Sequence, residues 1–246
     1  MAVFERGPVS IYFEEHGTGF PLLVLAPGGM NSSVEFWERV PINPIELFGN
    51  ELRVIAMDQR NAARSSGPLP VDDPWGAYAD DQLGLMDHLG LDQFLAMGCC
   101  IGCSFILKLV ERQPQRIVGG VLMQPVGIFE RNRDQVVPRV YADWGRELAE
   151  RREDVSEEDV ERFGRRMWDQ EFVLSVTREF LKTVETPLLV LPGNDVAHPT
   201  HIGLEVAKLL PRSEVLERWK TPDAVPQATE RVREFLFRHA GAGVPG

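Results

Sequence analysis

Three cysteines, Cys99, Cys100 and Cys103, lie close together between an apolar run at residues 94–97 and an amphipathic stretch. The middle one is the centre of a Gly-x-Cys-x-Gly pattern, flanked by Gly98 and Gly102. In a sharp turn from a buried strand into a helix, the central residue has a strained backbone, and glycines two residues away on either side avoid a clash with it. A helix N-terminus lowers a thiol's pKa from about 8.5, so some reactive thiolate exists near neutral pH. The segment predicts that Cys100 is a nucleophile.

The other two cysteines have simpler interpretations. Cys99 is expected to fill a small apolar space beside the strand, and Cys103 to be a small packed residue of the helix. Cys100 and Cys103 have a C-x-x-C spacing that permits a disulfide under oxidation. Neighbouring cysteines point apart, and a structural zinc site needs four suitably spaced ligands, so no metal site is predicted. The glycine-containing turn at residues 16–19 lacks the spacing of a dinucleotide loop, and no cofactor is predicted.

A candidate general base lies far along the chain from the cysteines. His198 follows Asp195 by three residues in one loop, so we expect its imidazole to lie within about 2.6–3.5 Å of Asp195 or Cys100. Pro199 favours the first turn of a helix, which would make His198 the residue that caps it. The positive helix end would then keep the imidazole neutral, as a base requires. The competing interpretation is that His198 only caps the helix or binds a backbone carbonyl.

Short apolar runs bounded by glycine or proline alternate with helical patterns, and together these elements would position the candidate residues. Such runs are typical of strands buried on both faces of a parallel sheet, and their alternation with helices predicts an α/β fold with an open sheet covered on both faces. The expected strands are residues 9–15, 22–26, 54–57, 94–97, 118–123 and 188–191; the expected helices are residues 77–89, 101–112, 200–210 and 227–238.

One segment interrupts the alternation. Residues 127–185 are charge-rich and contain helical spacings, with a helix start expected at Ser156, so they divide a core of residues 1–126 and 186–246. The segment is either a further packing layer or a lid over the carboxyl edge of the sheet, where open α/β sheets bind ligands. We favour a lid, because its aromatic residues would otherwise have no large core to join. The expected substrate-pocket residues are Met30, Trp144, Phe163 and Trp168.

Composition limits the classes of partner. With 246 residues, 43% hydrophobic and 26% charged, the chain has the composition of an ordinary globular protein. Its net charge of −11 disfavours binding to nucleic acid or to an anionic membrane surface. The first residues lack a signal peptide's apolar core, and the three clustered cysteines do not suit a secreted disulfide scaffold. A cytoplasmic protein acting on a small molecule is expected, and a homodimer is left open.

In these residues and their spacing, the chain resembles the α/β-hydrolase family. Residues 22–29 are similar to the family's strand and oxyanion loop, with Pro27 in place of histidine. Residues 58–65 resemble its Asp-x-Arg-Gly-x-Gly-x-Ser segment, with Asn61 and Ala63 in place of glycines. Residues 187–199 resemble the strand and loop that carry the family's acid, and the insertion falls where the family has a helical cap.

The resemblance implies a role for each part of the site. Cys100 stands where the family usually has serine, and Asp195 matches the acid that orients the base. The backbone N–H groups of Gly29 and Ile101 would form the oxyanion hole. The family also has a histidine between its last strand and last helix, but residues 219–226 contain none. Cysteine tolerates this loss better than serine does, because a thiol ionises without a strong base.

Three functions follow as alternatives. The first is an enzyme that cleaves a small ester, lactone or thioester, with an apolar or aromatic part, by attack of Cys100, while Asp195 and His198 move protons. The second is a hydrolase fold that has lost hydrolysis and binds a small ligand as a receptor or carrier, which the missing loop histidine favours. The third is a cofactor-free lyase or cyclase that uses the oxyanion hole and not the thiol.

Overall fold

The computed structural model describes residues 2–241, apart from the side chains of residues 139 and 140. One eight-stranded sheet has the order β1-β2-β4-β3-β5-β6-β7-β8, in which β1, β2 and β4 pair antiparallel and all other neighbours pair parallel. The strands are β1 (Ala2–Arg6), β2 (Val9–His16), β3 (Pro21–Leu25), β4 (Arg53–Met57), β5 (Phe94–Cys99), β6 (Ile117–Met123), β7 (Leu188–Leu191) and β8 (Ser213–Val215).

The predicted α/β fold with a mostly parallel open sheet is confirmed. All six expected strands form. Five of them, β3 to β7, are apolar runs that the sheet buries on both faces, and β2 is buried over most of its first half. Two strands were missed. β1 lies at the edge of the sheet and buries only Phe4, and β8 is only three residues long, so neither carries a continuous apolar run.

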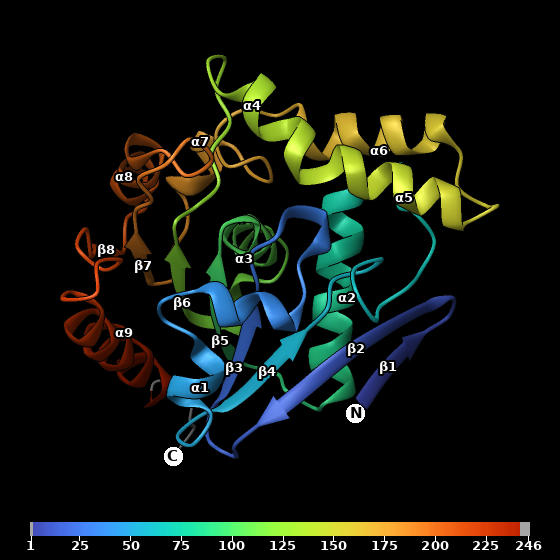
Figure 1. Ribbon diagram of the computed structural model, residues 1–246. Coiled ribbons are helices and arrows are strands. Elements are labelled where there is room, and N and C mark those ends of the chain that lie inside the picture. Colours follow the sequence, from blue (N-terminus) through green and yellow to red (C-terminus); the bar gives the residue numbers. More distant parts are fainter. Residues whose placement is uncertain (1, 242–246) are drawn as a thin grey trace.

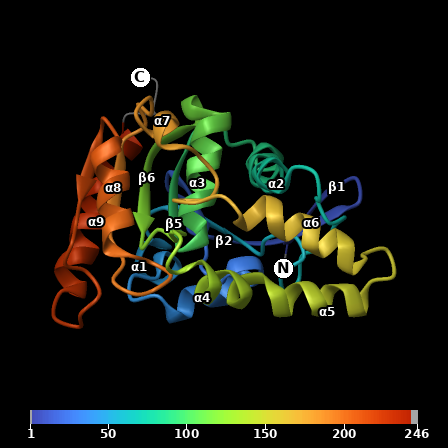
Figure 2. The same ribbon diagram turned by 90° about the horizontal axis from the view of Figure 1, so that it is seen from above.

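Helices cover both faces of the sheet (Figure 1). Neighbouring glycines of β6 show this, because a side chain at Gly119 would meet His239 of α9 and one at Gly120 would approach Ile106 of α3. α2 lies beside α3 on the same face (Figure 2). The main helices of these layers are α1 (Pro44–Phe48), α2 (Pro74–His88), α3 (Ile101–Arg112), α8 (Thr200–Leu209) and α9 (Val225–Ala240).

Residues 127–185, here called the cap segment, lie between β6 and β7 and form helices. Figure 1 shows them on the side of the sheet where the parallel strands end. Ser156 begins α6 with a capping box to Asp159, as the sequence predicts. The elements are α4 (Arg133–Val137), a π-helical turn (Pro138–Ala142), α5 (Asp143–Arg151), α6 (Glu157–Trp168) and α7 (Arg178–Leu181).

Several hydrogen bonds tie the cap segment to the core, and those of Trp144 and Asn132 are buried or partly buried. The Trp144 indole Nε1 donates to the backbone oxygen of Asn61 at 3.0 Å. At its base, the Asn132 amide donates to the backbone oxygens of Gly127 (2.7 Å) and Val196 (2.8 Å). The second tie joins the start of the cap segment to the loop that carries Asp195 and His198. Among residues 2–241, no helix is long and apolar enough to cross a membrane.

Candidate active site

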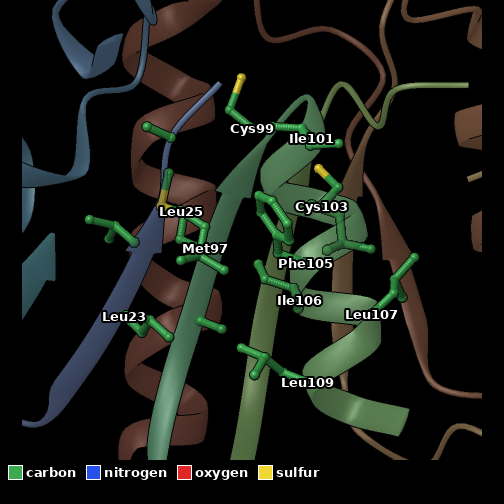
Figure 3. Packing of buried hydrophobic residues seen from close by; sticks show 14 of the residues in the cluster. Leu23, Leu25, Met97, Cys99, Ile101, Cys103, Phe105, Ile106, Leu107 and Leu109 are labelled. Carbon is green, nitrogen blue, oxygen red and sulfur yellow. The ribbon is translucent and has the colours of Figure 1, made fainter. Parts of the chain in front are cut away.

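The turn from β5 into α3 has the strained geometry that the sequence predicts. Cys100 has φ 58° and ψ −117°, a conformation that side chains rarely adopt, and α3 begins at the next residue. A Cβ on Gly98 would lie 2.6 Å from the backbone of Gly102, and a Cβ on Gly102 would lie 2.0 Å from the Leu25 oxygen. Both glycines are therefore required for the strand and helix to approach (Figure 3). The turn presents Cys100 at the end of the central strands, with 9% of its surface exposed.

Gly102→Ala is expected to destabilise the fold by about 3 kcal/mol or more, because the added methyl meets a backbone carbonyl that cannot rotate away. Thermal or denaturant unfolding measures this. Gly241→Ala is the matched control, since a Cβ there meets nothing within 4 Å, and it should change stability little. Equal stability of the two variants would contradict this account of the turn.

Asp195 and His198 form a close pair in the loop after β7. The His198 Nδ1 lies 2.8 and 2.9 Å from the two carboxylate oxygens of Asp195. The backbone N–H groups of Ala197 and His198 also donate to the Asp195 Oδ1, each at 3.0 Å, so the carboxylate orders its own loop. The His198 Nε2 is buried and makes no hydrogen bond within the described residues.

The expectation that His198 caps a helix is wrong. Pro199 stands at the N-cap of α8 without a side-chain cap, and the helix begins at Thr200. Proline has a fixed φ and here continues the extended loop, so Pro199 itself takes the cap position before Thr200. The His198 side chain is instead free to turn toward Asp195.

The imidazole of His198 interacts with the Cys100 thiol. Burial raises the pKa of Cys100, but the positive charge of His198 outweighs it, together with the backbone N–H groups of Ile101 and Gly28, and the pKa falls below its usual value. Burial lowers the pKa of His198, but the negative charge of the thiolate and the hydrogen bond to Asp195 raise it to about 9. The His198 hydrogen bond in turn holds the pKa of Asp195 well below its usual range.

These shifts correct the expectation of a neutral imidazole. Two anionic neighbours, the carboxylate of Asp195 and the thiolate of Cys100, favour the protonated ring, and no helix end opposes them because His198 is not a cap residue. The lowered pKa of Cys100 and the raised pKa of His198 both favour a thiolate beside an imidazolium.

The other two thiols are buried and inert. Burial raises the pKa of Cys99, and it raises the pKa of Cys103 well above its usual value. The Cys103 thiol donates to the backbone oxygens of Gly98 (3.3 Å) and Met123 (3.2 Å), beneath the turn. All three cysteines are free.

Backbone N–H groups from two segments face the thiol. One is that of Ile101, as the sequence reasoning proposed for the oxyanion hole. The other is that of Gly28, the residue before the proposed Gly29; both glycines have positive φ, 121° and 59°, in the turn after β3. The sequence motif locates this turn, but which of its N–H groups reaches the thiol depends on backbone dihedrals that a motif does not give.

The expected pocket residues are all buried. Trp144 and Phe163 stack on one another with ring centroids 5.3 Å apart, which places both in the packing between α5 and α6. Met30 lies in the turn next to Gly29, and Trp168 is fully buried with its Nε1 unpaired among the described residues. A groove of ≈ 530 Å³ between α5 and α6 lies on the cap segment and is lined by residues such as Ala149.

The structure adds one residue that sequence reasoning did not consider. Lys220 lies in the loop between β8 and α9, where the α/β-hydrolase pattern has its histidine. Its Nζ is 3.0 Å from the Asn194 Oδ1 and 3.6 Å from the Asp195 Oδ2. The family pattern has a histidine in this loop, so the sequence gives no signal for the lysine. Among the described residues, no group of three or more His, Cys, Asp or Glu side chains could hold a metal ion.

Comparison with known proteins places this site in a family context. A family model described as the alpha/beta hydrolase fold matches residues 21–191. The chain is 29% identical over 114 residues to the 2-hydroxymuconate semialdehyde hydrolase of Pseudomonas sp. strain CF600, which covers 46% of this chain and 39% of that one. It is 28% identical over 123 residues to the zearalenone hydrolase of Cladophialophora bantiana, covering 48% of this chain and 44% of that one. The aligned part thus spans less than half of these curated relatives.

Solved structures agree on the fold over a longer stretch. The enol-lactonase of Burkholderia xenovorans LB400 superposes with a TM-score of 0.69 over 96% of this chain and all of that one, at 19% identity. At that identity the likeness concerns the fold. The match of the family model to most of the chain, including β3, the Cys100 turn and β7, shows that the protein belongs to the alpha/beta hydrolase fold family.

Proposed function

We propose that this protein is a hydrolase that cleaves a small ester, lactone or thioester through an acyl-thioenzyme on Cys100. The observation that carries the proposal is the Asp195–His198 pair, with the His198 Nδ1 on the carboxylate and its buried Nε2 unpaired, near enough to Cys100 for the charges to shift each other's pKa. The missing loop histidine favoured a non-hydrolytic binder. His198, reached from a different loop, supplies the function that the missing residue would serve.

The proposed reaction proceeds in two halves. The Cys100 thiolate attacks the carbonyl carbon, and the oxygen that becomes negative accepts hydrogen bonds from the N–H of Ile101 and from the Gly28–Gly29 turn. The His198 imidazolium gives its proton to the leaving oxygen or sulfur as that bond breaks. Neutral His198 then takes a proton from water, whose oxygen attacks the thioester. Release of the acid returns the thiolate and the imidazolium.

The nucleophile also indicates which leaving groups the site prefers. When the tetrahedral intermediate collapses, either the thiolate or the substrate's leaving group departs, and the group with the lower pKa departs faster. A thiol with a lowered pKa is expelled in preference to an alkoxide. The proposed substrates therefore have an enol, phenol or thiol as leaving group, and simple alkyl esters are poor substrates.

Turnover of a matched set of acetyl compounds tests this proposal. Phenyl acetate and a thioester of acetate are expected to have kcat/KM values at least about 100-fold above that of ethyl acetate, beyond their difference in spontaneous hydrolysis. Their acyl groups are identical, so binding of the acyl part is held constant. Ethyl acetate turning over as fast as phenyl acetate would contradict the proposal.

The pH dependence of kcat/KM follows from the two shifted groups. Activity is expected to rise as Cys100 ionises below its usual pKa, and to fall again at about pH 9, where His198 loses the proton that the leaving group needs. A bell-shaped profile with its alkaline limb near pH 9 is the expected result. A profile that keeps rising above pH 10 would mean that His198 does not act as the acid.

We further propose that the cap segment acts as a lid. Its supports are its position at the carboxyl ends of the parallel strands and the bond between Gly127 N–H and the Ala197 oxygen (3.0 Å), which joins its first residue to the His198 loop. We also propose that the substrate has an apolar or aromatic part, because apolar side chains such as Met30 lie beside the turn that faces Cys100. The free cysteines suit a reducing compartment such as the cytoplasm.

A further inference from the structure

The loop between β8 and α9 places a cation beside the acid of the candidate site. The Lys220 Nζ lies 3.0 Å from the Asn194 Oδ1 and 3.6 Å from the Asp195 Oδ2. Its side chain is 22% exposed, whereas that of Asp195 is 50% exposed. Lys220 therefore covers part of the open side of a carboxylate that water would otherwise surround.

The lysine is itself held in place. The neighbouring Trp219 is buried, and its indole Nε1 donates to the backbone oxygen of Pro192 at 2.8 Å, directly after β7. The Lys220 ammonium lies 5.4 Å from the centre of the same indole ring. This anchoring fixes the loop of Lys220 against the loop of Asp195, so the contact between the two side chains joins two ordered segments.

The charges of the site explain what this cation does. Asp195 and the Cys100 thiolate carry two negative charges, and the His198 imidazolium carries one positive charge. A second positive charge makes the group neutral overall. The Lys220 ammonium also contacts the Asp195 Oδ2, while the His198 Nδ1 binds the Asp195 Oδ1. Together the two contacts restrict rotation of the carboxylate.

We infer that Lys220 is a positioning residue, which holds Asp195 against His198 and balances the charge of the thiolate–imidazolium pair. The inference rests on the proposed function and takes its support from the two distances and the Trp219 anchor. Lys220 lies in the loop where the α/β-hydrolase pattern carries a histidine, and from this loop it contacts Asp195.

The other charged groups of this loop are Glu217, Arg218 and Asp223. Arg218 pairs with Asp223 on the solvent side of the loop. Glu217 lines the shallow cavity next to Lys220, together with Asn194. Facing His198 are Asp195 and Cys100, with the buried thiol of Cys99 next to the latter. Among the described residues, the cationic side chains that contact Asp195 are thus those of His198 and Lys220.

The test measures alkylation of Cys100 by iodoacetamide as a function of pH, which needs no substrate. Lys220→Met keeps the length of the side chain and removes its charge. It is expected to move the alkylation midpoint upward by about half a pH unit, since loss of the ammonium beside Asp195 leaves more negative charge near the thiol, which disfavours the thiolate. With phenyl acetate, kcat should fall about 5- to 20-fold while KM changes less than about 2-fold. Lys220→Arg should restore most of both.

Arg218→Met is the matched control, because it removes the same charge from the neighbouring residue, which contacts Asp223 and not Asp195. It should leave the midpoint and kcat unchanged. An unshifted midpoint in Lys220→Met, or an equal shift in Arg218→Met, would overturn the inference while leaving the proposed function intact. Failure of the proposed function is seen separately, as slow alkylation of Cys100 in the unmodified protein at pH 7.

Discussion

Cys100→Ala is expected to lower kcat/KM with phenyl acetate by about 10³-fold or more, to the background set by the oxyanion donors and binding alone. Alanine fits the same strained backbone and removes the sulfur that attacks the carbonyl. Cys100→Ser should lose nearly as much, because a hydroxyl has a pKa far above that of a thiol and gains little from the helix end or from His198. Steady-state kinetics measures both.

Cys103→Ser is the matched control for this prediction. Its thiol donates to two backbone oxygens below the turn, and a serine hydroxyl can make the same contacts. The variant should retain turnover within about 5-fold, and thermal unfolding of all three variants checks that the fold is kept. If Cys100→Ala retains substantial turnover, covalent catalysis is wrong, and the lyase or cyclase alternative takes its place.

His198→Gln is expected to lower kcat by about 10²- to 10⁴-fold, because it removes both the acid for the leaving group and the base for the water. It should also raise the pKa of Cys100, since the positive charge of His198 is what overcomes the burial of the thiol. Alkylation of Cys100 at pH 7 should therefore slow in the same variant. One substitution thus has two readouts, of which the second is independent of substrate.

His201→Gln is its control. His201 lies on the first turn of α8, three residues after His198, and its ring contacts Phe129 with centroids 5.1 Å apart. Its replacement should change neither turnover nor alkylation beyond about 2-fold. Normal alkylation of Cys100 at pH 7 in His198→Gln would show that the helix end alone ionises the thiol, and would remove His198 from the proposed mechanism.

The parts of this fold that can be predicted from the sequence are the strands whose residues are nearly all buried. β3, β4, β5, β6 and β7 are buried on both faces, so their apolar runs appear directly in the chain. The turn around Cys100 was visible because its two glycines are required by contacts of 2.0 and 2.6 Å. The edge strand β1 and the short β8 leave no such pattern.

The electrostatics of the site were beyond sequence reasoning, because they depend on distances between separate loops. Spacing placed Asp195 and His198 in one loop, but only the structure shows that the imidazole faces both the carboxylate and the thiol. The charges of these two neighbours raise the pKa of His198, which reverses the expectation of a neutral imidazole at a helix cap. Lys220 was missed in the same way, since a lysine in a loop has meaning only beside its acceptor.

The most direct test of the central claim is to trap the acyl group on the protein. The protein is mixed with excess phenyl acetate, quenched in acid within the first turnovers, and its intact mass and peptides are measured. The account predicts a mass gain of one acetyl group, located on Cys100 and not on Cys99 or Cys103, that decays when the substrate is used up. Phenol released in turnover without any acetylated Cys100, or an acetyl group that forms and is never hydrolysed, would contradict it.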